Sequence, residues 1–130
     1  MKPVAIPLLL FVAATLTACG GGSADTSVLA TAAADATPAS SFNVVAEDIE
    51  FDTDTLVVVA GREVVIDFEN RDGAMHNIAV FTEKGGDVIY RGELFTGDDR
   101  REYRFQAPPA GVYYFHCDAH PEMEGVFIAR

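Results

Sequence analysis

The sequence predicts an all-β domain, an antiparallel sandwich or barrel of about seven to eight strands. Three observations support this fold class. Short runs rich in Val, Ile, Phe and Tyr begin at residue 42, turn-forming residues separate these runs, and no long helical pattern occurs after residue 20. Antiparallel all-β domains show this alternation of short apolar runs and turn residues because each short strand is followed by a tight connection.

Each expected strand ends at residues that favour turns. The clearest alternation of apolar and polar residues is Glu63–Glu69, which predicts a strand with one buried face. Turn signals occur at Gly61, Asp72-Gly73, Gly85-Gly86, Gly97-Asp98-Asp99 and Pro108-Pro109-Ala110-Gly111. The expected strands are residues 42–50, 55–60, 63–70, 75–81, 88–95, 102–106, 111–116 and 125–129.

Length and composition allow one small domain with a short appendage. The protein has 130 residues, 49% of them apolar, so it can bury a core. The formal net charge is −11 at pH 7 and the basic residues are thinly spread, which argues against a nucleic-acid-binding surface. The acidic run from Glu47 to Asp54 would either keep the protein soluble or dock a basic partner protein. Strand alternation slightly favours the first interpretation, because it divides these charges between two faces.

The first 18 residues predict an export signal with a lipid attachment site behind it. Lys2 is followed by an uncharged apolar run that is short for a transmembrane span and suits a signal peptide. Leu16-Thr17-Ala18-Cys19 resembles a bacterial lipobox, so lipid is expected on Cys19. The alternative is an ordinary signal peptide with an incidental Cys.

The predicted organisation therefore has three parts: a lipoprotein signal peptide at residues 1–18, a lipidated Cys with a flexible linker at residues 19–41, and the β-rich domain at residues 42–130. The linker is rich in Gly, Ser, Ala and Thr, which cannot bury enough apolar surface to fold. The expected location is the periplasm-facing side of the cell envelope. Cys19 is followed by Gly20 and not by Asp, which resembles lipoproteins that are sent to the outer membrane in cells with two membranes.

Residues near the C-terminus predict a copper site. Cys117, His120 and Met123 follow one another at three-residue intervals on a loop between two expected strands, and His76 begins an upstream apolar run. Two His and one Cys with a weak axial Met are the ligands of a blue, type 1 copper site. Each residue alone has an ordinary structural explanation. Together, in this order, they predict one copper ion per chain that alternates between Cu(II) and Cu(I).

The two cysteines of the chain allow a second interpretation. Two Cys in an exported protein first suggest a disulfide, here between Cys19 and Cys117. Each Cys has another explanation in its own surroundings, the lipobox in one case and the ligand loop in the other. The metal site is therefore preferred to the disulfide.

The ligand pattern resembles the cupredoxin family, which includes plastocyanin, azurin, pseudoazurin and amicyanin. The spacing Cys-x-x-His-x-x-Met, followed by Gly125 and a β-run, is similar to the short ligand loop of amicyanin. The resemblance covers residues 42–130 and implies a cupredoxin-like Greek-key sandwich. It also implies that Asn77 ties the two ligand-bearing segments together. The implied copper ligands are His76, Cys117, His120 and Met123.

The resemblance implies electron transfer and no enzymatic activity. The expected protein is a membrane-tethered monomer that shuttles single electrons between exported redox proteins, such as c-type cytochromes, a reductase or an oxidase. His120 is the implied exit for the electron. The alternative function is that of a copper-binding lipoprotein that buffers or delivers copper at the cell envelope.

His116, directly before Cys117, is a candidate secondary site residue. In copper nitrite reductases and multicopper oxidases, a His beside the Cys ligates a second copper centre. Such centres require several more imidazoles, and this chain has three His, two of which are already assigned. Strand alternation turns His116 away from Cys117, which predicts a surface position next to the site.

Overall fold

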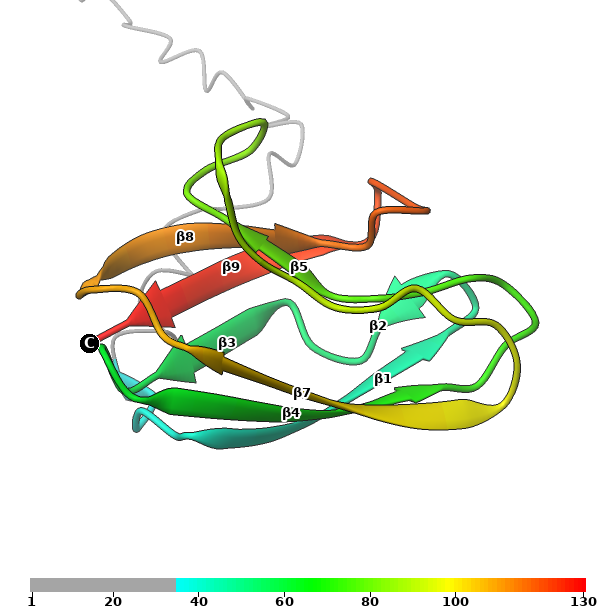
Figure 1. Cartoon of the computed structure of the whole chain (residues 1–130), viewed down its shortest axis with the longest axis horizontal. Coiled ribbons are helices and arrows are strands. Elements are labelled where there is room, and N and C mark those ends of the chain that lie inside the picture. The colour runs from blue at the N-terminus through cyan, green and yellow to red at the C-terminus, as the bar shows by residue number, and fades with distance from the viewer. Residues whose placement is uncertain (1–34) are drawn as a thin grey trace, which may run out of the picture.

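Two β-sheets packed face to face form the domain in the computed structural model, which describes residues 35–130 (Figure 1). One sheet has four strands in the order β2-β1-β4-β7, and the other has five in the order β3-β9-β8-β5-β6. The expected β-sandwich is confirmed. The strands are β1 (Ser41–Glu47), β2 (Glu50–Phe51), β3 (Thr55–Val58), β4 (Glu63–Asn70), β5 (Ala79–Phe81), β6 (Val88–Arg91), β7 (Asp99–Gln106), β8 (Gly111–His116) and β9 (Glu124–Ala129).

Both sheets are mixed, because each contains one parallel pair of strands. β1 pairs with β4 and β3 pairs with β9 in the parallel sense, whereas the other neighbours are antiparallel. The β1–β4 pair is parallel because the chain leaves the first sheet after β2, adds β3 to the second sheet, and returns as β4. The expected antiparallel arrangement is therefore wrong for these two pairs, because sequence periodicity reports which face of a strand is buried and not how its neighbour runs.

Alternating side chains from the two sheets fill the space between them. In β4, Val64, Ile66 and Phe68 are fully buried, while the residues between them are partly exposed. Cys117 and Met123 belong to the same hydrophobic cluster as these side chains. Two of the expected ligands are therefore part of the packed core, which restrains their positions.

A β1–β2 hairpin occupies the segment expected to be a single strand at residues 42–50. Asp48 and Ile49 have φ angles of 55° and 62° and form a two-residue turn, so that Glu47 pairs with Glu50. Ile is β-branched and rarely adopts positive φ, so no turn was predicted at this position.

β5 and β6 are shorter than predicted. β6 ends at Arg91 and does not reach Phe95, and β5 begins at Ala79 and not at Met75. His76 and Phe95 instead form an isolated antiparallel bridge, with N–O distances of 3.1 and 3.2 Å in the two directions. His76 is therefore held in a connection next to the strands, where its side chain can meet those of another loop.

No helix within residues 35–130 is long and apolar enough to cross a membrane. The expected signal peptide, the expected lipid site Cys19 and the linker as far as residue 34 lie outside the described residues. The chain joins the sandwich at Ala39, whose backbone forms a parallel bridge with Val58 of β3.

Candidate metal centre

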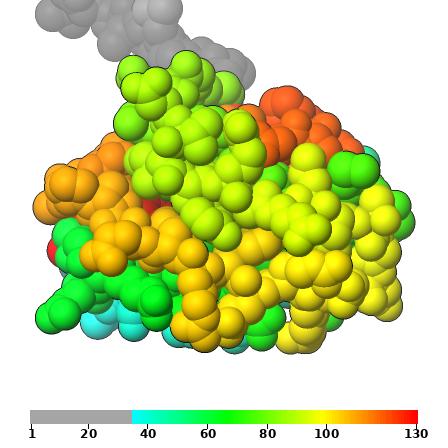
Figure 2. Space-filling model, in the orientation of Figure 1, coloured from blue at the N-terminus to red at the C-terminus, as the bar shows by residue number. Residues whose placement is uncertain are grey.

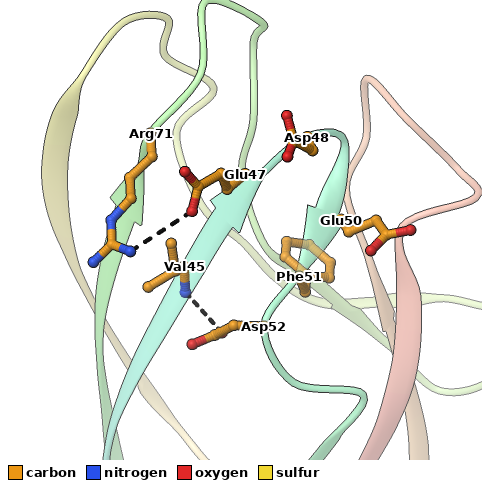
Figure 3. A pocket seen from close by; sticks show the side chains of 7 residues that line it. All are labelled: Val45, Glu47, Asp48, Glu50, Phe51, Asp52 and Arg71. Carbon is orange, nitrogen blue, oxygen red and sulfur yellow. Dashed lines mark hydrogen bonds and ion pairs between the residues drawn. The ribbon is translucent and has the colours of Figure 1, made fainter.

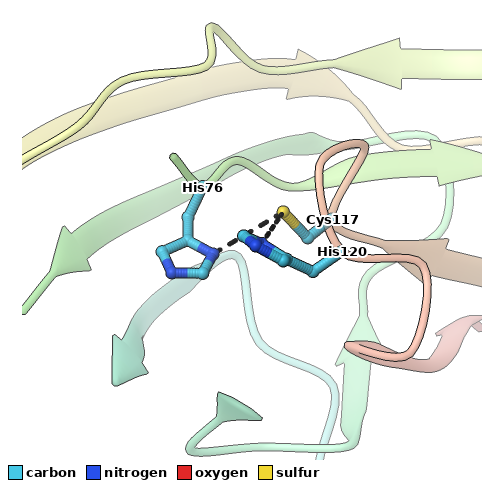
Figure 4. A group of neighbouring side chains, drawn as sticks. All are labelled: His76, Cys117 and His120. Atoms are coloured by element: carbon cyan, nitrogen blue, oxygen red, sulfur yellow. Dashed lines mark hydrogen bonds between the residues drawn. The ribbon is translucent and has the colours of Figure 1, made fainter. Parts of the chain in front are cut away.

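Three of the expected ligands lie together at the end of the sandwich where β8 stops. The Nδ1 atoms of His76 and His120 lie 3.7 and 3.8 Å from Cys117 Sγ, and the ligand atoms of all three residues fall within 4.8 Å of one another (Figure 4). His76 comes from the connection between β4 and β5, and the other two residues come from the loop between β8 and β9. The fold thus brings together donors from two distant parts of the chain.

Backbone hydrogen bonds fold the ligand loop, Cys117 to Met123, into a tight unit. His120 N donates to Cys117 O at 3.2 Å, and Met123 N donates to His120 O at 2.9 Å. Cys117 N donates to Met123 O at 3.0 Å, which closes the loop where it meets β9. Met123 is 3% exposed and lies in the core cluster with Cys117. The three-residue spacing therefore places each candidate donor at a hydrogen-bonded corner of the loop.

Asp72 orients the ring of His76, which is fully buried. Nε2 of His76 lies 2.8 Å from Oδ1 and 2.9 Å from Oδ2 of Asp72. Burial alone would raise the pKa of Asp72. Hydrogen bonds from the Ala74 N–H and from His76 lower the pKa by more than burial raises it, so the pKa lies below its ordinary value. A charged Asp72 keeps the proton of the neutral imidazole on Nε2 and leaves Nδ1 as the lone-pair donor facing Cys117.

Asn77 links the two ligand-bearing segments. Its Nδ2 donates to Asp118 Oδ2 and to Gly92 O, each at 2.8 Å, and its Oδ1 accepts from Asp118 N at 2.9 Å. The side chain is 1% exposed, so losing these partners would leave a buried amide unsatisfied. This is the tie between segments that the family resemblance implied for Asn77.

His116 projects from the face of β8 opposite to Cys117 and is not part of the three-residue cluster. Its ring lies 4.7 Å from that of Phe81 and 5.4 Å from that of Tyr114, measured between centroids. The side chain is 19% exposed, so neighbouring aromatic rings cover it more than strand alternation alone predicts. Its Nε2 lies 3.9 Å from Asp118 Oδ1.

The donor set fits copper better than other common metals. Two imidazole nitrogens and a thiolate sulfur converge, with a thioether from Met123 in the same loop. Ca²⁺ and Mg²⁺ prefer oxygen ligands, and zinc takes Cys, His, Asp or Glu and not Met. Within residues 35–130 Cys117 has no disulfide partner, so its sulfur can bind a metal as a thiolate.

The ligand loop also reaches the surface, where it appears orange-red at the upper right in Figure 2. Pro121 and Glu122 are exposed, His120 is partly buried, and His76 and Cys117 are fully buried. One imidazole of the cluster therefore lies between the buried donors and the solvent.

A family model described as a cupredoxin-like domain matches residues 8–129. The chain belongs to the cupredoxin-like family. This result confirms the resemblance inferred from the ligand spacing. No curated protein matches the chain significantly in sequence.

Solved structures of cupredoxins share this fold. An auracyanin from Roseiflexus castenholzii is 18% identical, with a TM-score of 0.65 over 72% of this chain and 99% of its own. Auracyanin A from Chloroflexus aurantiacus, a "blue" copper protein, is 23% identical, with a TM-score of 0.62 over 72% of this chain and 100% of its own. Amicyanin from Paracoccus versutus is 32% identical, with a TM-score of 0.53 over 75% of this chain and 88% of its own.

Two residues that support the cupredoxin centre were not predicted from the sequence. Asp72 was taken only as part of a turn signal, although its position four residues before His76 was visible. Arg91, whose Nε lies 3.0 Å from Asp118 Oδ2, left no sequence signal, because the contact depends on how β6 ends beside the ligand loop.

Proposed function

We propose that this cupredoxin is a membrane-tethered electron carrier. One copper ion is held by His76, Cys117, His120 and Met123. The convergence of both Nδ1 atoms on Cys117 Sγ, inside a packed core, is the observation that carries the proposal. Copper bound there supplies a one-electron couple between Cu(II) and Cu(I), and no bond of a substrate is made or broken.

The chain contributes a rigid and largely dry environment. Asp72 and Asn77 hold their respective segments, and the hydrogen-bonded ligand loop leaves the donors little freedom to move. A donor set that cannot rearrange suits rapid electron exchange, because the ligands need not reorganise when the charge at the centre changes.

His120 is the residue through which we expect electrons to enter or leave. His120 is partly exposed. Two exposed apolar side chains, those of Met75 and Leu94, directly precede His76 and its bridge partner in the chain. Met75, 45% exposed, precedes His76, and Leu94, 37% exposed, precedes the Phe95 that pairs with His76. Exposed apolar groups beside a redox centre would allow a partner to approach closely and exclude water.

An acidic surface adjoins this region. Glu47, Asp48, Glu50 and Asp52 line an open hollow of about 260 Å³ beside Arg71 (Figure 3). The β1–β2 turn gathers charges that a continuous strand would have divided between two faces. A second hollow of about 220 Å³ extends the acidic surface to the ligand loop; its lining includes Glu50, Asp54, Glu122, Met123 and Glu124.

This charge favours redox partners that present a basic surface, such as c-type cytochromes, a reductase or an oxidase. Attachment through Cys19 would keep the carrier, as a monomer, at the periplasmic side of the cell envelope. Because the chain joins the sandwich at Ala39, the proposed tether would be about 19 residues long; a flexible coil of that length has a mean end-to-end distance of about 24 Å, which would give the domain room to turn between partners. A Cys19→Ala variant should leave the membrane fraction; continued attachment would argue against the lipid anchor.

The central test is a Cu(II) titration of the full chain, followed by visible absorption and electron paramagnetic resonance. An intense thiolate-to-copper band, narrow parallel hyperfine splitting and saturation at one copper per chain are expected, with loss of the band in Cys117→Ser. A pale complex that gives up copper rapidly to a chelator would support copper buffering or delivery instead.

A further inference from the structure

An ion pair lies directly behind the cysteine of the metal centre. Arg91, the last residue of β6, lies with Nε 3.0 Å from Oδ2 of Asp118, and Asp118 follows Cys117 in the chain. The Asp118 side chain is 19% exposed, and that of Arg91 is 53% exposed. A mostly buried carboxylate is therefore paired with a cation that reaches the solvent.

Neighbouring contacts fix both members of the pair. Asp118 Oδ2 also accepts the hydrogen bond from Asn77 Nδ2, and the carbonyl of Gly92, next to Arg91, accepts a second bond from the same nitrogen. The Arg91 guanidinium lies 5.8 Å from the centre of the Phe81 ring. The Asp118 carboxylate and the backbone next to Arg91 are thus tied to one buried amide, which keeps the Asp118 charge in a constant position relative to Cys117.

The charges of Asp118 and Arg91 would act on a copper ion whose own charge changes when it is reduced. One electron from a redox protein converts Cu(II) to Cu(I), and no proton or covalent bond takes part in that step. A nearby negative charge stabilises the more positive, oxidised state, whereas a nearby positive charge favours the reduced state. Solvent ions screen a largely covered carboxylate such as Asp118 much less than an exposed one.

We propose that Asp118 and Arg91 set the reduction potential of the copper through opposed charges. Asp118 lowers the potential, and Arg91 restores most of that loss. The inference rests on the proposed electron-transfer function and adds the residues that adjust the energy of the carried electron. Neither residue needs to touch the metal, because each charge acts on the copper through space.

The test is a redox titration of the copper-loaded full chain and its variants, with the visible spectrum as the check that the centre is intact. Arg91→Gln should decrease the equilibrium constant for reduction about tenfold, which is about 59 mV for a one-electron couple. Asp118→Asn keeps an oxygen acceptor for Asn77 and should increase the constant by a similar factor. The reduction potential of the double variant should return close to that of the wild type. Arg91→Lys keeps the positive charge, so its potential should also be close to that of the wild type.

Arg104→Gln is the matched control. The Arg104 side chain is also 53% exposed and also paired, with Glu63 at 3.3 Å and Glu102 at 2.7 Å, but it lies on β7 in the other sheet. Its potential should equal that of the wild type. The proposal is overturned if Arg91→Gln shifts the potential no more than this control, or if Arg91→Gln and Asp118→Asn shift it in the same direction.

Two further outcomes are also decisive. If Asp118→Asn does not load copper, Arg91→Gln and Arg91→Lys are compared, and equal potentials for these two variants overturn the proposal. A wild-type chain without a reversible one-electron copper couple overturns the proposed function itself, and the inference falls with it. A normal wild-type couple with unresponsive variants overturns the inference alone.

Discussion

Asp72 and His76 form a carboxylate–imidazole pair in the connection between β4 and β5, with His76 Nε2 at 2.8 and 2.9 Å from the two oxygens of Asp72. The pair directs Nδ1 of a fully buried ring toward Cys117 Sγ, 3.7 Å away. Carboxylates in this position raise the basicity of a ligating imidazole and fix its orientation. The geometry is thus set before any metal binds.

Replacing Asp72 by Ala should therefore weaken copper binding by about 10- to 100-fold. The measurement is a competition titration against a chelator of known affinity. Asp67→Ala is the control, because Asp67 is 45% exposed and its ion pair with Arg100, at 3.5 Å, lies on β4 away from the ligands. Equal affinities of the two variants would show that Asp72 does not support the centre.

The contrast between His76 and Asp72 shows what sequence alone can predict about this site. The donors His76, Cys117, His120 and Met123 were recognisable because their chemistry is specific and three of them lie within one loop. The role of Asp72 depends on the direction in which a turn points its carboxylate. That direction follows from bridges such as His76–Phe95, which form only when the sandwich closes.

The same distinction applies to the fold. The alternation in β4 predicted its buried face, because that pattern is local and one face of the strand meets the core. The hairpin turn at Asp48 and Ile49 runs against local preference, and the parallel pairing of β1 with β4 depends on where the chain crosses between sheets. Tertiary packing decides both features, so no short window of sequence contains them.

Gly125 should tolerate no side chain. A Cβ at this position would lie 2.5 Å from the backbone oxygen of Asp54 and would collide with the ring of Phe115. Backbone cannot move aside as a flexible side chain can, so Gly125→Ala should reduce the free energy of unfolding by about 1–3 kcal/mol. Denaturant unfolding of the copper-free protein measures this change. Gly73→Ala, which would meet nothing within 4 Å, should cost much less.

Ile49 should be strained in the β1–β2 turn. A left-handed conformation costs an L-residue with a Cβ about 1–2 kcal/mol, a cost that Gly does not bear. Its φ is 62° and its side chain is 42% exposed, so little packing opposes a change of residue. Ile49→Gly should be more stable than Ile49→Ala by about 1 kcal/mol, because both variants remove the Ile side chain and only the first removes the Cβ. Equal stabilities of the two variants in denaturant would show that the turn is not strained.

Glu124 should make the copper-free protein sensitive to acid. Lys84 Nζ donates to Glu124 Oε2 at 2.6 Å, and the Tyr114 hydroxyl donates to the same oxygen at 2.5 Å. The hydrogen bond from Lys84, and then that from Tyr114, hold the pKa of Glu124 below its ordinary value of 4.5. The folded state therefore binds this proton less readily than the unfolded state, which stabilises the fold above pH 4.5.

That stabilisation should disappear as the pH falls through the lowered pKa of the folded state. Thermal unfolding measured from pH 7 to pH 3 should show a smaller loss of stability for Glu124→Gln than for the wild type. Lys84→Met should give a similarly flattened profile, and the double variant should add little, because both changes remove one interaction. Parallel profiles for the wild type and Glu124→Gln would mean that this carboxylate has the same proton affinity in the folded and unfolded chains.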